Sequence, residues 1–246
     1  MAEHGAQYDA IGNRYEAYTR IATLKEAECY TFFRMAGVLE GKRVLDVACG
    51  FGFYTRLLKQ RGAAQVLGVD ISPEMLRLAY QQEQAEPLGI TYQVGDAVTL
   101  PQLGTVDLVT AVHLLTYATS QDQLLGMFRS LYANLVVGGR FLAITNNPAF
   151  TLSKPNCTKY GVTVLRLEPE ADRYACEAEF VTDPPFRVQW SQWHQAPYEW
   201  ALQEAGFRDF AWYPAEVAPD AMGRYGEAYW RDFYDNCPII GLICQK

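Results

Sequence analysis

A helical repeat of apolar and aromatic residues is the first pattern along the chain. Between residues 7 and 36 such side chains recur every three or four positions, starting with Tyr8, Ile11 and Tyr15. That spacing aligns them along one face of a helix. Gly37 follows, and glycine commonly ends a helix. The pattern therefore predicts a single helix over 7–36 whose apolar face packs against the rest of the chain.

From residue 43 to residue 145, short apolar runs alternate with amphipathic segments. Ser72 and Pro73 form a typical helix start, because serine caps free N–H groups and proline suits the first helical position. Strands that are apolar on both faces are typical of a parallel sheet covered by helices on each side. The sequence thus predicts helices over 53–60, 73–83 and 121–135, and strands over 43–48, 65–69, 90–94, 106–112 and 140–145.

After Pro148 apolar and polar residues alternate one by one. This alternation predicts antiparallel strands that bury one face. Asp183-Pro184-Pro185 separates two of these strands and predicts a turn. A helix over 196–205 and an antiparallel strand pair complete the chain. The expected lid strands are 160–168, 173–181 and 186–193, and the expected C-terminal pair is 207–213 with 239–245.

Together these elements predict an α/β fold, a Rossmann-like doubly wound, mostly parallel sheet with a C-terminal antiparallel strand pair and a small antiparallel lid. A length of 246 residues suits one such domain better than two. We expect a single domain over 1–246, in which an N-terminal helical cap (1–40) precedes a ligand-binding core (41–147), a lid insertion (148–195) and a C-terminal helix with strands (196–246).

Composition narrows the classes of partner. Half of the residues are hydrophobic, and 21 Lys and Arg against 28 Asp and Glu leave a net charge of −7. That balance disfavours non-specific binding to nucleic acid. No apolar run approaches the roughly 20 residues of a membrane helix, and the N-terminus lacks the pattern of a secretory signal. We expect a cytoplasmic protein without a nucleic-acid or membrane partner, and the sequence does not predict its oligomeric state.

Metal and redox chemistry have little support in the sequence. The six cysteines are scattered without a Cys-x-x-Cys pair, and there are only three histidines. Such spacing does not suggest zinc ligands or a redox dithiol. We expect reduced thiols and no metal site.

Residues 44–55 carry the most informative pattern, Val-Leu-Asp-Val-Ala-Cys-Gly-Phe-Gly-Phe-Tyr-Thr. A buried strand runs into a turn of small residues, and a helix follows at once. Gly50 and Gly52 permit positive φ and let a ligand approach the backbone closely. The free N–H groups of the helix start favour an anionic ligand group. Asp46 opens the loop, where it would repel a pyrophosphate but attract an ammonium.

This loop resembles motif I of class I S-adenosylmethionine (SAM)-dependent methyltransferases, with Ala48 in place of the first glycine. Further family segments follow in order: an acid at the end of the second strand, Asp70; the segment Gly95-Asp96-Ala97; a motif IV-like strand from Val106 to His113; and the turn from Leu135 to Phe141. The resemblance covers about residues 40–146.

The resemblance implies that the core binds SAM and releases S-adenosylhomocysteine. Asp46 would meet the methionine ammonium, Asp70 the ribose hydroxyls, and Ile71 the adenine ring, while Asp96 and Ala97 would lie at the adenine amine. The cofactor-binding set is Tyr8, Asp46, Ala48, Gly50, Gly52, Asp70, Ile71, Asp96, Ala97 and Val112.

A narrower similarity extends over the whole chain. The tyrosine-rich N-terminal helix, Asn146-Asn147-Pro148, Trp230 and Pro238-Ile239-Ile240 look like small-molecule methyltransferases of bacterial specialised metabolism. Toxoflavin-pathway N-methyltransferases and related indole C-methylating enzymes are examples. This similarity implies a small aromatic or heterocyclic acceptor and a role such as antibiotic biosynthesis. It leaves open whether N, O or C is methylated.

His113 and Tyr15 are the catalytic candidates. His113 follows the fourth strand at the sheet edge where ligands of α/β folds bind, so its imidazole can act as a base or orient the acceptor. Packing alone is the alternative role, since in-line transfer from a sulfonium can rely on positioning. Tyr15 shares a helix face with Tyr8. Aromatic residues are expected to wall the acceptor pocket: Tyr18, Tyr117, Tyr160, Trp190, Trp193 and Tyr229.

Three other functions fit less well. An NAD(P)-dependent oxidoreductase would need its glycine fingerprint completed near Tyr54-Thr55, where glycine is absent. A non-catalytic SAM-binding regulatory protein would bind SAM without turnover. Methylation of macromolecules is disfavoured by the negative charge. Asp183-Pro184-Pro185-Phe186 spells a motif of enzymes that methylate nucleic-acid bases, but it lies between the lid strands and not after the fourth strand.

Overall fold

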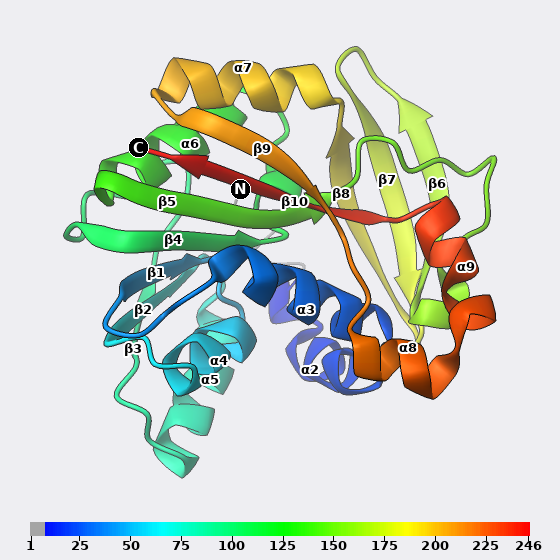
Figure 1. The fold of residues 1–246 in the computed structure, drawn as a ribbon, viewed down its shortest axis with the longest axis horizontal. Coiled ribbons are helices and arrows are strands. Elements are labelled where there is room, and N and C mark those ends of the chain that lie inside the picture. Colours follow the sequence, from blue (N-terminus) through cyan, green and yellow to red (C-terminus); the bar gives the residue numbers. More distant parts are fainter. Residues whose placement is uncertain (1–7) are drawn as a thin grey trace.

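The fold is built on a seven-stranded sheet in the order β3-β2-β1-β4-β5-β10-β9. A computed structural model describes residues 8–246 (Figure 1). Strands β1 to β5 are mutually parallel, whereas β10 is inserted antiparallel between β5 and β9. The strands are β1 (Arg43–Val47), β2 (Gln65–Asp70), β3 (Thr91–Val94), β4 (Val106–Val112), β5 (Leu135–Asn146), β9 (Arg208–Pro214) and β10 (Ile239–Gln245).

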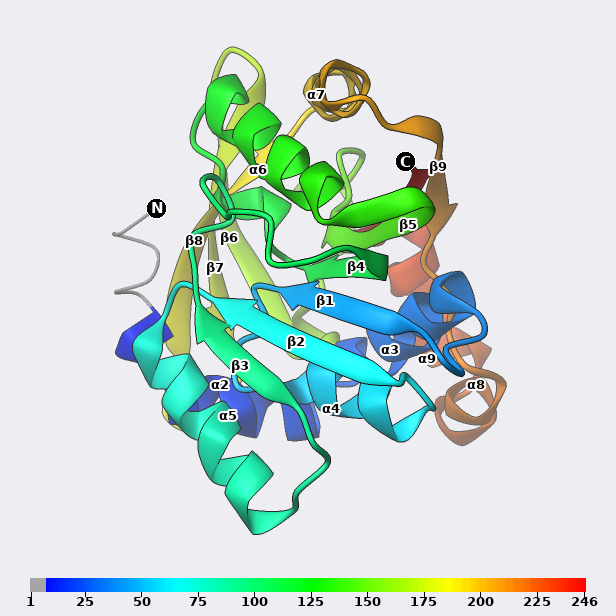
Figure 2. The same cartoon turned by 90° about the vertical axis from the view of Figure 1, so that its left-hand side faces the viewer.

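Helices cover both faces of this sheet, as Figures 1 and 2 show. One face packs against α3 (Leu24–Ala36), α4 (Phe53–Gln60) and α5 (Pro73–Ala85). The short helix α2 (Gly12–Ile21) packs instead against α5 and Phe180. The other face packs against α6 (Gln121–Ala133) and α7 (Gln195–Ala205). Within residues 8–246, none of the helices combines the length and apolar character that crossing a membrane requires. The expected three-layer α/β fold is confirmed.

A second, three-stranded antiparallel sheet lies at the edge of the main sheet where β1, β2 and β4 end (Figures 1 and 2). It consists of β6 (Val162–Pro169), β7 (Arg173–Phe180) and β8 (Phe186–Trp193). Asp183-Pro184 lies in the turn between β7 and β8, as predicted. We refer to this second sheet as the lid sheet, because its apolar face, with Cys176, Ala178 and Phe180, closes over the end of the main sheet.

The N-terminal segment differs from the prediction of one helix. Ala22 is extended, with ψ 119°, and ends α2 before α3 begins. Gly161 explains the break: a Cβ there would lie 2.7 Å from the Cβ of Ala22, so the chain from the lid passes close against this point. Thr23 also contacts the hydroxyl of Tyr229 at 2.8 Å. Because of this break, α3 runs along the main sheet, whereas α2 crosses the ends of its strands.

The other differences lie in the C-terminal half. Two short helices, α8 (Pro219–Tyr225) and α9 (Glu227–Asp235), connect β9 to β10 and were not predicted from the sequence. Strand β5 begins at Leu135, within the segment predicted as the end of a helix, because Leu135 pairs with Val106. Tyr160 stacks on the fully buried Trp230 of α9, with ring centroids 5.3 Å apart. These aromatic residues therefore join the lid to the C-terminal segment.

Candidate functional site

The first of two adjoining cavities lies where β1, β2 and β4 end, at the edge of the sheet where ligands of open α/β folds bind. It holds about 580 Å³ of empty space. We call it the loop cavity, because the turn between β1 and α4 forms one wall. Its lining residues are Tyr8, Tyr15, Ala48, Gly50, Asp70, Ile71, Met75, Val112, His113, Leu114 and Tyr117.

The turn after β1 depends on small residues for two different reasons. Gly50 has φ 56° and a Cβ added there would meet no atom within 4 Å, so its open side faces the loop cavity. Gly52 has φ 87°, but a Cβ there would lie 2.5 Å from the hydroxyl oxygen of Tyr92. Ala48, which replaces the family glycine, also has a positive φ of 59°. Only Gly50 and Ala48 of these three line the cavity.

Asp70 lines the loop cavity at the end of β2. Its Oδ2 accepts a hydrogen bond from the Gly50 N–H at 2.7 Å, and its Oδ1 accepts one from the Ser72 N–H at 2.9 Å. Burial raises the pKa of Asp70, and these N–H donors partly offset that effect. A carboxylate oxygen has two lone pairs, so both oxygens can accept a further hydrogen bond from a ligand.

Asp46 lies deeper than expected. It is 2% exposed and does not line either cavity. Its two oxygens accept hydrogen bonds from the hydroxyls of Thr55 and Thr110, each at 2.7 Å. Burial without a cation beside it raises the pKa of Asp46 to about 6. These hydrogen bonds hold β1, α4 and β4 together, and the expected contact with an ammonium stays a prediction.

Two more residues of the expected cofactor set lie outside the loop cavity. Asp96 accepts a hydrogen bond from the N–H of Val98 at 2.9 Å and shapes the turn after β3. Ala97 is buried in the core on the α6 side of the sheet. Asp46 and Gly52 lie outside this cavity as well. The other six residues of the expected cofactor set line it: Tyr8, Ala48, Gly50, Asp70, Ile71 and Val112.

The second cavity lies under the lid sheet and holds about 660 Å³ of empty space. We call it the lid cavity. Tyr8, Tyr15, His113 and Tyr117 line both cavities, so these four residues form the boundary at which the cavities meet. Both catalytic candidates thus lie at this boundary. The structure brings them together from two elements, α2 and the segment after β4.

The expected acceptor-pocket residues divide into two groups. Tyr18, Tyr117 and Trp190 line the lid cavity. Tyr160, Trp193 and Tyr229 lie outside it. Trp193 is fully buried on the α6 side of the sheet, where its Nε1–H donates to the carbonyl of Ala118. Tyr229 belongs to α9 and packs against Tyr160, whose hydroxyl donates to the Tyr229 carbonyl at 2.7 Å.

His113 is held by contacts at its backbone and its ring. Its φ is 59°, a left-handed conformation that is uncommon outside glycine, and its N–H donates to the carbonyl of Ile144 at 2.8 Å. The ring Nε2 lies 2.8 Å from Oε2 of Glu28, a residue of α3. This contact joins the N-terminal helices to the end of β4.

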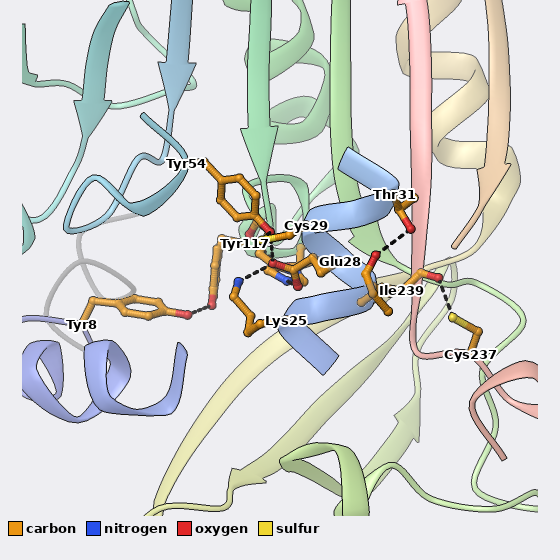
Figure 3. A network of polar contacts seen from close by, with 12 residues as sticks. Tyr8, Lys25, Glu28, Cys29, Thr31, Tyr54, Tyr117, Cys237 and Ile239 are labelled. Atoms are coloured by element: carbon orange, nitrogen blue, oxygen red, sulfur yellow. Dashed lines mark hydrogen bonds and ion pairs between the residues drawn. The ribbon is translucent and has the colours of Figure 1, made fainter. Parts of the chain in front are cut away.

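Glu28 is the centre of a buried charge network (Figure 3). It is 1% exposed, forms an ion pair with Lys25 and accepts a hydrogen bond from the Tyr54 hydroxyl at 2.7 Å. Burial by itself would raise the pKa of Glu28, but Lys25 and His113 reverse this effect and hold it below the ordinary range. Glu28 therefore remains a carboxylate and accepts the Nε2–H of His113. Sequence reasoning missed Lys25 and Glu28; their only signal was an acid three residues after a base on an apolar helix face.

Tyrosine hydroxyls complete the boundary. Figure 3 shows the hydroxyls of Tyr8 and Tyr117 in contact, and both residues line both cavities. Burial raises the pKa of Tyr15 well above that of free tyrosine, and the charge of Glu28 adds to the effect. Tyr15 is thus a neutral donor at physiological pH. Within the described part of the chain, no group of three or more His, Cys, Asp or Glu side chains is arranged to hold a metal ion.

Comparison with known proteins agrees with this geometry. Residues 44–139 match the family model of a methyltransferase domain. A demethylmenaquinone methyltransferase from Thermus thermophilus is 34% identical over 109 residues, which are 44% of this chain and 48% of that protein. The chain thus spans about half the length of this curated relative.

Solved structures extend the similarity to nearly the whole fold. A SAM-dependent methyltransferase from Mesorhizobium loti superposes with a TM-score of 0.65 at 22% identity, covering 89% of this chain and 98% of that one. SAM-bound CalS10, an amino pentose methyltransferase from Micromonospora echinaspora involved in calicheamicin biosynthesis, gives 0.62 at 18% identity, covering 94% and 96%. The chain therefore has the fold of these SAM-dependent methyltransferases, and its residues 44–139 match a methyltransferase-domain model.

Replacing Asp46 by Asn should stabilise the protein without ligand. Because the pKa of Asp46 is raised in the folded state, its ionisation opposes folding as pH rises from about 4 through about 6. A rise of about two pKa units corresponds to about 1–3 kcal/mol. Urea unfolding near neutral pH should show that gain for Asp46→Asn, and the gain should shrink at about pH 4. Equal stability of the wild type and the variant at both pH values would contradict the raised pKa of Asp46.

Replacing Glu28 by Gln should have the opposite effect. The change leaves Lys25 buried without a counter-charge, which costs about 3–5 kcal/mol. Because the pKa of Glu28 is lowered in the folded state, the loss should be complete near neutral pH and should diminish as pH falls below about 4. The double variant Lys25→Met/Glu28→Gln should recover most of the stability. Urea unfolding measures all three proteins, and a stable single variant would refute the charge network.

Proposed function

We propose that this protein transfers the methyl group of SAM to a small aromatic or heterocyclic acceptor. The observation that carries the proposal is the meeting of two cavities at His113 and Tyr15. One cavity is lined by Asp70 and the glycine loop of the matched methyltransferase domain, and the other is enclosed by the lid sheet. A methyl donor and an acceptor held in these two cavities would meet at the boundary.

The loop cavity suits a cationic amino-acid nucleoside. Asp70 would accept hydrogen bonds from the ribose hydroxyls, and the open side of Gly50 would receive the methionine part. Asp46 lies behind the loop, 2% exposed and outside both cavities, and would act through its negative charge. Two buried carboxylates beside one cavity would repel a pyrophosphate. This electrostatic argument disfavours the oxidoreductase alternative.

SAM supplies an activated methyl group when bound, so the protein has only to position the acceptor and remove its proton. Glu28 accepts the Nε2–H of His113, which leaves the lone pair on Nδ1. Nδ1 would then be free to take the proton of an acceptor O–H or N–H. Tyr15, a neutral donor at the boundary, would orient the acceptor or the cofactor carboxylate.

The acceptor class rests on the walls of the lid cavity. Tyr18, Phe180 and Trp190 line it, and flat aromatic rings pack well against such side chains. The segment 148–195 would serve as a lid that keeps water away from the reacting atoms. A role in specialised metabolism, in the cytoplasm, is part of this proposal, supported by the likeness of the fold to CalS10. The direct test is mass spectrometry of a metabolite panel for methylation by the purified protein with SAM.

Cofactor binding should depend on Asp70. Calorimetry should detect binding of SAM and S-adenosylhomocysteine, and Asp70→Ala should weaken both by about 1–3 kcal/mol, because a charged hydrogen-bond acceptor is lost. Asp107→Ala is the matched control: Asp107 opens β4 at the opposite end and pairs with Arg43. The Asp107→Ala variant should bind SAM and S-adenosylhomocysteine as tightly as the wild type does. Failure of the unmodified protein to bind either compound would refute the proposed function.

His113→Asn should lower kcat on an acceptor found in the panel by about 10²–10⁴-fold, because the general base is lost. Asparagine tolerates the left-handed backbone at this position, so the fold should be kept. The loss should appear in kcat, while KM changes little. His194→Asn is the control, since His194 lies outside both cavities before α7. A loss of kcat below tenfold would contradict a base role.

A further inference from the structure

The lid cavity contains buried hydrogen-bond donors that the protein itself does not pair. Among residues 8–246, three buried side-chain polar atoms have no hydrogen-bond partner in the protein: the hydroxyl of Tyr92, Nδ2 of Asn146 and Nε1 of Trp190. Asn146 and Trp190 both line the lid cavity, whereas Tyr92 lies under α5. Two of the three unpaired groups therefore belong to residues that line one cavity.

These two donors come from different elements and are firmly held. Asn146 is the last residue of β5, is 9% exposed and pairs in register with Ile239 of β10. It lies two residues beyond Ile144, whose carbonyl accepts the N–H of His113. Trp190 pairs with Cys176 across the lid sheet and packs against Phe180. The main sheet thus provides one donor and the lid sheet the other.

Burial without a partner is costly for a hydrogen-bond donor. A similar polar side chain in the same cavity shows the usual arrangement: Nε2 of Gln192 donates to the carbonyl of Phe150 at 2.9 Å. Such a cost is retained at ligand sites, where a bound molecule supplies the missing acceptor. The unpaired state of Asn146 and Trp190 therefore points to hydrogen-bond-accepting atoms on whatever fills the cavity.

The charge of the cavity wall limits the ligand further. Lys25 is the cationic side chain of the wall, and it is already paired with Glu28. The ion pair leaves little net charge to attract an anionic ligand or a cationic one. Apolar side chains such as Leu24, Val162 and Ile239 form much of the remaining wall. The cavity thus combines an apolar surface with two neutral donors.

We propose that the acceptor is an uncharged conjugated ring system that presents at least two hydrogen-bond-accepting atoms, carbonyl oxygens or ring nitrogens, to Asn146 and Trp190. This inference rests on the proposed function, because it assigns the acceptor to the lid cavity. Methylation takes place at the boundary with His113, while the two donors recognise the part of the ring that lies deeper under the lid. They determine which ring is accepted and in which orientation.

Matched ring compounds test this recognition. Calorimetry on the full chain saturated with S-adenosylhomocysteine should compare quinoxaline, which has two ring nitrogens, with naphthalene, which has the same shape and none. Quinoxaline should bind about tenfold more tightly, the usual effect of one or two neutral hydrogen bonds. Equal affinity of the two compounds, or no binding of either, would overturn the proposal.

Variants then assign the effect to the two donors. Asn146→Leu and Trp190→Phe should each weaken quinoxaline binding several-fold to tenfold and leave naphthalene binding within about twofold. Trp193→Phe is the matched control, because the Nε1–H of Trp193 is already paired with Ala118 and lies outside the cavity. An unchanged preference for quinoxaline in both cavity variants would show that these donors do not recognise the ring.

Two further measurements separate this proposal from the broader one. S-adenosylhomocysteine should bind all variants as tightly as it binds the wild type. If the wild type itself does not bind S-adenosylhomocysteine, the proposed function is refuted, and not only the proposed acceptor. Asn146→Leu should also unfold at the same temperature as the wild type or at a higher one, because it removes an unpaired donor. A clear loss of stability would mean that Asn146 serves the fold and would count against a recognition role.

Discussion

The contact between Glu28 and His113 joins the two halves of the site. Glu28 belongs to α3, and His113 follows β4, so their 2.8 Å contact connects the N-terminal helices to the edge of the sheet. Both cavities meet at this connection. Lys25 keeps Glu28 ionised within the core, and ionised Glu28 in turn determines which ring nitrogen of His113 holds the proton. The geometry of the boundary therefore depends on one buried ion pair.

Two buried carboxylates on the same side of the sheet behave oppositely. Glu28 has a cation beside it and its pKa is lowered, whereas Asp46 has only the hydroxyls of Thr55 and Thr110 and its pKa is raised. Glu28 consequently stabilises the fold. Ionised Asp46 lowers the stability of the folded protein as long as no positive charge lies near it. Such a loss of stability is typical of ligand-binding sites, where a residue serves binding and not folding. The uncompensated charge behind the glycine loop is thus a physical reason for the loop cavity to prefer a cation.

In the proposed function, the lid sheet contributes to recognition of the acceptor. Its apolar face covers the strand ends, and Trp190 brings an unpaired donor to the cavity wall. Asn146 of β5 provides a second donor in the wall of the same cavity. The proposed recognition of the acceptor therefore uses both the lid sheet and the main sheet, and His113 follows β4 of the same main sheet.

Local pattern determined most of the main fold. The strand-turn-helix around Gly50, the acid at the end of β2 and the alternating lid strands could all be predicted, because they depend on hydrophobic periodicity, glycine conformation and helix capping. The position of His113 at the end of β4 followed from the same pattern. Tertiary contacts decided the rest. The N-terminal helix is interrupted where Gly161 packs against Ala22, and the hydroxyls of Thr55 in α4 and Thr110 in β4 donate hydrogen bonds to Asp46. Glu28 became part of the site only because folding placed α3 against β4. Burial, pairing and the partner of a charge are properties of neighbours distant in sequence, and no local pattern encodes them.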